Sequence, residues 1–173
     1  LKPKRMPHVL GTEQEAALLA KKYGADVTAA RIAALLHDCT KKLDLPQQLS
    51  LCRHYAIPLD EMERNYLKLL HSKTGAAVAR DRFGVSDEIY NAIFYHTTGK
   101  ADMTLLEKII YLADYIEPSR SFPGVEELRT AVHEDLDRGL CRALADSIVE
   151  LQGYGSPVHP NTQEALSYIP PQI

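Results

Sequence analysis

The sequence is poor in cysteine, with only Cys39, Cys52 and Cys141. Their odd number and wide spacing argue against a disulfide framework and against a zinc site built from thiolates. No apolar run approaches the roughly 20 residues of a membrane-spanning helix, and no signal peptide is recognisable. We therefore expect a protein of the reducing cytoplasm that has no membrane partner.

The sequence also lacks a strong excess of charge of one sign, because its net charge is −3 over 173 residues. This balance excludes a general attraction to nucleic acid, so any site for a polyanion must come from a local cluster of cations. A hydrophobic content of 45% and a charged content of 25% are ordinary for a globular protein. The length predicts a single domain with a real core.

Repeats, low-complexity segments and the alternating pattern of β-strands are absent as well. The remaining pattern is helical, with capping residues and glycines between segments, and it predicts an all-α fold. The expected helices include about 8–23, 46–55, 60–70, 72–83, 86–96 and 104–116. A further helix, capped by Asp26 or Thr28, is expected to carry residues 37 and 38. The segment 125–152 is expected to form one bent helix or two helices, with Gly139 as the weak point, and a short last helix starts at a capping box over 161–164.

The dipeptide His37-Asp38 is the most informative feature, because it interrupts an otherwise apolar helical stretch. That helix is expected to be buried nearly all round. A buried imidazole beside a buried carboxylate needs partners, since an isolated charge in an apolar interior is very costly. A divalent metal is one such partner. A core histidine paired with its neighbour or with a helix end is the alternative, which the dipeptide alone favours.

Four more residues carry side chains that bind metals, at expected helix ends or on polar faces: His8, His71, His96 and Asp114. Each has an ordinary explanation when taken alone. His71 is expected just before a helix, as a linker residue, and His96 at a helix end, where it would gain from the helix dipole. His8 would be an exposed terminal residue, and Asp114 part of a solvated stripe. Their combination with the dipeptide favours a metal site.

The combination resembles the HD-domain metal-dependent phosphohydrolase superfamily, in the subgroup that holds two metals. The residues around it resemble the bacterial YqeK family of symmetrical diadenosine tetraphosphate hydrolases. This resemblance implies a single HD-domain helical bundle over 1–173, with a metal-binding core at about 5–120 and a short helical extension with a nucleotide-contacting loop at about 121–173. The segments that carry it are His8-Val-Leu-Gly11, His37-Asp-Cys-Thr-Lys41, His71-Ser-Lys-Thr-Gly75, His96-Thr-Thr-Gly99, Tyr111-Leu-Ala-Asp-Tyr-Ile-Glu-Pro-Ser-Arg120 and Phe122-Pro-Gly-Val125.

The resemblance implies two divalent metal ions, with iron as the first choice and manganese, nickel, cobalt or zinc as alternatives. The first ion would be held by His8, His37, Asp38 and Asp114, and the second by His71 and His96, with Asp38 between the two. Imidazole and carboxylate suit these metals without any thiolate. Two such ions can share a water, acidify it to hydroxide and direct it at phosphorus.

Phosphoryl transfer also needs fixed positive charge. The candidate cations are Arg5, Lys41, Arg120 and Arg129. Arg120 is favoured, because Pro118 ends the preceding helix and leaves this arginine beside the metal-binding face. Lys41 is open between a phosphate contact and a surface cation, and Arg129 is better explained as a surface cation. We assign catalytic roles to Asp38, Lys41 and Arg120.

The Gly/Pro-rich loop before the last helix is the predicted nucleotide contact, since free backbone N–H groups at a helix start suit a phosphate or ribose. A structural turn made by its two prolines is the alternative. His159 is interpreted as part of this loop rather than as a seventh ligand, and His54 and His133 as surface or packing residues. The predicted substrate contacts are Arg5, His8, Asp38, Asp114, Arg120, Pro157, Val158, His159, Pro160, Asn161 and Thr162.

The activity implied by the resemblance is hydrolysis of diadenosine tetraphosphate to two molecules of ADP, and a homodimer is a further expectation of the same kind. Three alternatives remain. Another HD-domain enzyme, such as a nucleotidase, a triphosphohydrolase or a cyclic-dinucleotide phosphodiesterase, would use the same metals. A nucleotide-sensing protein that has lost turnover, or a structural helical domain, would have no need for six intact candidate ligands.

Overall fold

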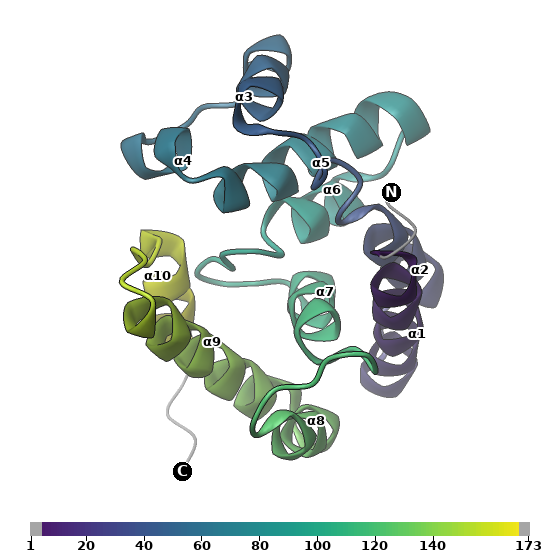
Figure 1. Cartoon of the computed structure of the whole chain (residues 1–173). Coiled ribbons are helices and arrows are strands. Elements are labelled where there is room, and N and C mark those ends of the chain that lie inside the picture. Colours follow the sequence, from purple (N-terminus) through teal and green to yellow (C-terminus); the bar gives the residue numbers. More distant parts are fainter. Residues whose placement is uncertain (1–4, 170–173) are drawn as a thin grey trace.

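The computed structural model describes residues 5–169, which form helices joined by turns and loops and contain no strand (Figure 1). This confirms the predicted all-α class. None of the helices in this range is both long and apolar enough to span a membrane. They are α1 (Met6–Tyr23), α2 (Val27–Leu36), α3 (Leu45–His54), α4 (Glu61–Asn65), α5 (Leu67–Phe83), α6 (Asp87–Phe94), α7 (Leu105–Ile116), α8 (Val125–Glu134), α9 (Leu136–Gly153) and α10 (Pro160–Tyr168).

Helix α7 lies in the middle of the bundle, in contact with α1, α2, α6, α8 and α9 (Figure 1). Its sequence explains this position, because Ile109, Ile110, Leu112 and Ile116 are apolar and fully buried around the helix. A helix that is apolar on nearly all sides belongs in a core. The predicted capping box at residues 104–107 is present and starts the helix. The last turns of α7 are thereby fixed at the centre of the molecule.

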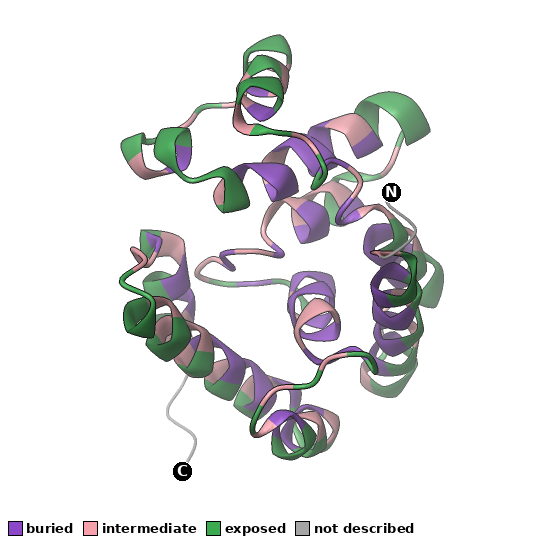
Figure 2. Cartoon of the chain, in the orientation of Figure 1, coloured by how far each residue is buried: buried purple, intermediate pink, exposed green. Residues whose placement is uncertain are grey.

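Helix α2 packs closely against α1 through small side chains. Asp26 caps α2 by accepting a hydrogen bond from the N–H of Ala29 at 3.0 Å, as one of the two predicted caps. The alanines of α2 are buried and face the core, whereas Leu35 is 41% exposed (Figure 2). The expectation that this helix is buried nearly all round is therefore wrong. The small alanine face is the buried one because it permits close approach to α1.

Three predicted helix boundaries near the site are also wrong. Helix α2 ends at Leu36, so His37 is its C-cap and Asp38 begins the following turn. Helix α5 starts at Leu67, which places His71 in its second turn rather than before its start. Helix α6 ends at Phe94, two residues before His96. In each case local propensity is overridden by packing, since all these histidines are buried.

The break between α8 and α9 falls at Asp135, not at Gly139. Asp135 has an extended backbone and caps α9 by accepting a hydrogen bond from the N–H of Arg138 at 2.9 Å. Gly139 has a different role, because a Cβ at this position would lie 2.5 Å from Cγ2 of Val132 and 2.6 Å from its Cα. The glycine allows α9 to pack directly on the backbone of α8.

Helix α10 begins one residue earlier than the predicted capping box. His159 is its N-cap, and Nδ1 of the ring accepts a hydrogen bond from the N–H of Asn161 at 3.1 Å. Asn161 is therefore inside the helix, and the prediction that it caps the helix is wrong. An imidazole nitrogen can accept this bond as a carboxylate or hydroxyl does, which sequence rules for capping do not include.

Candidate metal centre

Six side chains from five separate segments meet at the centre of the bundle. They come from α1, the turn after α2, α5, the turn after α6, and α7: His8, His37, Asp38, His71, His96 and Asp114. All are buried except Asp114, which is partly exposed. The structure thus brings together every residue that the sequence predicted as a metal ligand.

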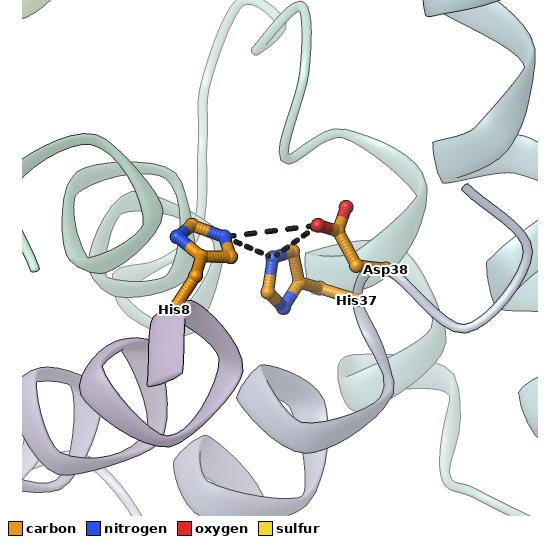
Figure 3. A group of neighbouring side chains, drawn as sticks. All are labelled: His8, His37 and Asp38. Atoms are coloured by element: carbon orange, nitrogen blue, oxygen red, sulfur yellow. Dashed lines mark hydrogen bonds and ion pairs between the residues drawn. The ribbon is translucent and has the colours of Figure 1, made fainter. Parts of the chain in front are cut away.

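The first half of this cluster contains His8, His37, Asp114 and one oxygen of Asp38. Nε2 of His8 lies 3.4 Å from Nε2 of His37 and 3.0 Å from Oδ1 of Asp114. Oδ2 of Asp38 lies 3.5 Å from Nε2 of His37 and 3.7 Å from Nε2 of His8 (Figure 3). The two rings and the carboxylate point toward one common centre (Figure 3).

The second half contains His71, His96 and the other oxygen of Asp38. The Nε2 atoms of the two rings are 3.2 Å apart. Oδ1 of Asp38 lies 3.4 Å from Nε2 of His71 and 3.8 Å from Nε2 of His96. This buried oxygen has no hydrogen-bond partner among residues 5–169; Nζ of Lys41, at 3.2 Å, is not aligned for one. Each oxygen of Asp38 therefore faces a different pair of imidazoles.

The hydrogen bonds of the rings fix which nitrogen carries the proton. In His37, His71 and His96, Nδ1 lies 2.5, 2.8 and 2.7 Å from the carbonyl oxygen three residues earlier in the chain. A carbonyl only accepts, so Nδ1 carries the hydrogen and Nε2 of a neutral ring offers a lone pair. Lone pairs that face one another without a proton donor repel, and a bound cation removes this repulsion.

Glu117 supports the fourth ring. Its Oε1 lies 3.1 Å from Nδ1 of His8, and its carboxylate also accepts hydrogen bonds from the N–H and the hydroxyl of Ser119 at 2.7 and 2.5 Å. Glu117 is buried and packs against Gly11, which has no Cβ to displace it. Glu117 is not among the residues predicted from the sequence. The available signal was an acidic residue directly after the predicted 104–116 helix, within one of the segments that carry the family resemblance.

Burial and neighbouring charges shift the pKa values in the cluster. Burial lowers the pKa of His96 to about 3, with help from the charges of His37 and His71, and burial also lowers the pKa of His71. Burial opposes the charged form of His37 too, but the nearby carboxylates of Asp38 and Asp114 outweigh it and raise the pKa. These results favour neutral rings at His71 and His96.

The two carboxylates of the cluster stay ionised. Burial alone would raise the pKa of Asp38, but its close contacts with the rings of His37 and His71 and the charge of Lys41 outweigh burial and hold the pKa far below its usual range. The pKa of Asp114 is also lowered, because its contact with His8 and the charge of His37 outweigh burial. Neutral imidazoles and ionised carboxylates are the forms that bind metals. The donor set therefore fits divalent first-row transition metals.

Three of the predicted cations lie beside the cluster. Arg5 donates from Nε to Oδ2 of Asp38 at 2.8 Å, and Nη2 also contacts that oxygen. Nζ of Lys41 lies 3.2 Å from Oδ1 of Asp38. Nη2 of Arg120 donates to Oδ1 of Asp114 at 2.8 Å, as expected from the helix end before it. Each of these three cations therefore contacts a carboxylate of the cluster.

Arg129 is not part of this group. Its guanidinium donates to the carbonyl oxygens of Ile116, Glu117 and Arg120, at 2.8, 2.8 and 3.0 Å. It therefore holds the chain that leaves the end of α7, the part of the protein that carries Glu117 and Arg120. It is neither a phosphate-facing cation nor the simple surface cation that the sequence favoured.

Two adjoining pockets open beside the cluster. The first, about 300 Å³, is lined by Lys41, His71, His96 and Asp114 among others. The second, about 190 Å³, lies under the predicted nucleotide-contacting loop and is lined by Ser156, Pro157, His159 and Thr162. The two share three lining residues, which are Lys68, Thr97 and Ser147. The two pockets therefore adjoin at these three residues, and we call this shared border the junction.

The predicted loop residues fall into different environments. Pro157, His159 and Thr162 line the second pocket, whereas Val158 and Asn161 line neither of the two. Pro160 lines a separate open pocket together with Pro157. His159 uses both ring nitrogens within the protein, since Nε2 also lies 3.1 Å from Oδ2 of Asp60. The ring therefore fixes the loop and leaves no free nitrogen for a nucleotide.

The comparisons with known proteins agree with this geometry. Residues 5–119, which include all six clustered side chains, match the HD domain family. The chain belongs to the HD-domain family. This HD-domain chain is 42% identical to the symmetrical bis(5'-nucleosyl)-tetraphosphatase of Halalkalibacterium halodurans, over 91% of this chain and 84% of that protein. It is 40% identical to the protein of the same name in Bacillus subtilis, over 91% of this chain and 85% of that protein.

A solved structure gives the same fold. It is a protein of Clostridium acetobutylicum described as a predicted HD superfamily hydrolase involved in NAD metabolism, with a TM-score of 0.95 and 42% sequence identity. The match covers 98% of this HD-domain chain and 90% of the other. Together with the sequence relatives, it confirms the family resemblance on which the site was predicted.

Proposed function

We propose that this HD-domain hydrolase cleaves diadenosine tetraphosphate symmetrically and releases two molecules of ADP. The observation that carries the proposal is the position of Asp38, whose two oxygens each face a different pair of imidazoles. This arrangement supports two metal ions rather than one. The relatives named symmetrical tetraphosphatases support the choice of substrate.

The residues of the chain have separable roles in this reaction. The six clustered side chains hold the ions, which when bound supply Lewis acidity that lowers the pKa of water and offset phosphate charge. Arg5, Lys41 and Arg120 present positive charge at the edge of the cluster, where non-bridging phosphate oxygens gain charge during transfer. Glu117 and the backbone carbonyls orient the rings.

The reaction balances as a hydrolysis at one of the two inner phosphates. The oxygen of water forms a bond to phosphorus, and the bond from that phosphorus to the central bridging oxygen breaks. The bridging oxygen leaves with the second ADP, and the proton of the water goes to solvent or to the leaving oxygen. Only attack that breaks this central linkage gives two identical products.

Several finer features stay predictions. Two ions per chain, iron as the native metal, a homodimer and a cytoplasmic location are expected from the resemblance, and the chemistry of the site is compatible with iron, manganese, nickel, cobalt or zinc. The contacts of the 157–162 loop with a nucleotide are also predictions. The second pocket under this loop supports them for Pro157 and Thr162.

Product analysis tests the proposed function. Metal-loaded protein is incubated with diadenosine tetraphosphate, and the nucleotides are separated by ion-exchange chromatography. We expect ADP as the sole nucleotide product and loss of turnover after chelation. ATP with AMP would contradict symmetrical cleavage. If fully metal-loaded protein does not hydrolyse diadenosine tetraphosphate but hydrolyses another nucleotide, that other nucleotide is the substrate.

A further inference from the structure

Lys68 lies where the two pockets beside the metal cluster meet. It is in the first turn of α5, one turn before His71, and its backbone carbonyl accepts the hydrogen bond from Nδ1 of that ring at 2.8 Å. Its side chain is exposed and lines both the pocket at the cluster and the pocket under the 156–162 loop. A group bound in either pocket would therefore lie beside this side chain.

The charge of Lys68 is not used within the described part of the chain. The other cations near the site form ion pairs: Arg5 and Lys41 with Asp38, and Arg120 with Asp114. No carboxylate of residues 5–169 pairs with Lys68, and the second pocket has no acidic residue in its lining. Positive charge without a partner at the border of two pockets attracts anions.

The stability of α5 gives no reason for a lysine at this position. A positive charge in the first turn of a helix is unfavourable because the helix dipole is also positive there. Helix α5 also has no side-chain cap at Tyr66, so the backbone N–H groups of its first turn are not used by a cap. These groups add to the positive potential at the junction of the two pockets. Thr97 and Ser147 line both pockets at the same junction, and their hydroxyls can donate hydrogen bonds to an anion.

We propose that the Lys68 ammonium binds a phosphate group of the substrate at the junction of the two pockets, on the nucleoside side of the metal cluster. The inference rests on the proposed function for its natural ligand, a dinucleoside polyphosphate. Lys68 is then a binding residue that selects for a phosphate chain reaching from the cluster toward the loop. Its backbone carbonyl has a separate role, the orientation of His71.

Binding of ADP and turnover of diadenosine tetraphosphate test this inference in the metal-loaded protein. We expect Lys68→Met to raise the Kd for ADP about tenfold and KM by a similar factor, with kcat within threefold of wild type and metal content unchanged. Lys68→Arg keeps the charge and should recover most of the affinity. The matched control is Lys21→Met, which removes an exposed lysine at the far end of α1 and should change neither constant.

The outcomes separate this inference from the proposed function. Equal ADP affinity in wild type and Lys68→Met overturns the role of Lys68, whatever the enzyme hydrolyses. Loss of metal in Lys68→Met overturns it too, because the effect would then act through His71. Wild-type protein that binds ADP but does not cleave diadenosine tetraphosphate contradicts the proposed function alone, and weaker ADP binding by Lys68→Met would still support the inference.

Discussion

Glu117 holds His8 from the side opposite the metal cluster, with Oε1 of the glutamate 3.1 Å from Nδ1 of the ring. The carboxylate is buried, and its hydrogen bonds to His8 and Ser119 outweigh the effect of burial and lower its pKa. Since an ionised carboxylate only accepts, His8 must donate from Nδ1 and offer the lone pair of Nε2 to the cluster. Glu117 therefore fixes the tautomer of His8, although Glu117 itself is not one of the six clustered side chains.

Replacement of Glu117 by glutamine should weaken metal binding without removing any of the six clustered side chains. Glutamine has nearly the same shape but no negative charge, so it supports the donating ring less well. We expect metal affinity to fall about 10- to 100-fold. Isothermal titration of the apo-protein with metal measures the change. Glu127→Gln, at an exposed position of α8, is the control, and equal affinities in the two variants would contradict this role.

Asp38→Asn should remove metal from both halves of the cluster. The change keeps the volume of the side chain but takes away the charge that each pair of imidazoles faces. We expect less than one ion in ten chains by elemental analysis and no detectable hydrolysis. Circular dichroism checks that the helices persist. Retention of one ion per chain would mean that Asp38 serves only one half.

Arg120→Ala should separate binding of the phosphate from binding of the metal. Nη2 of Arg120 contacts Asp114 from the edge of the cluster, and the side chain remains partly exposed there. Loss of its charge should lower kcat/KM about 100-fold while metal content stays at the wild-type level. Steady-state kinetics with elemental analysis measure both quantities. Metal loss as complete as in Asp38→Asn would make Arg120 a structural residue instead.

Gly139 and Gly153 form a matched pair in α9. A Cβ at Gly139 would lie within 2.9 Å of three atoms of Val132, two of them backbone, whereas a Cβ at Gly153 would have nothing within 4 Å. We expect Gly139→Ala to lower the free energy of unfolding by roughly 1–3 kcal/mol. Gly153→Ala should change it by less than about 1 kcal/mol. Thermal unfolding measures both, and equal effects would contradict the close packing of α8 on α9.

The sequence predicted the site better than it predicted the helix ends that carry it. His37 and Asp38 were recognised because polar residues in an apolar stretch need partners, which is a property of composition and spacing. Their placement in a turn, and that of His71 inside α5, depends on packing between helices that are far apart in sequence. The capping boxes and caps that are purely local, such as Asp26 and Thr104, were predicted correctly.

The support around the ligands was largely out of reach of sequence reasoning. Glu117 and Arg129 look like ordinary charged residues along the chain, and only the fold brings one to His8 and the other to the carbonyl oxygens after α7. The same holds for Lys68, whose importance comes from the meeting of two pockets. Long-range contacts of this kind leave no periodic signal in the sequence.

The ratio of metal to protein decides whether the two oxygens of Asp38 and the four imidazoles form one centre for two ions. Apo-protein is loaded with ferrous iron under anaerobic conditions, freed of unbound metal by gel filtration and measured by elemental analysis. We expect two ions per chain. A saturating ratio of one would contradict the dinuclear centre, and a ratio of zero would contradict a metal centre altogether.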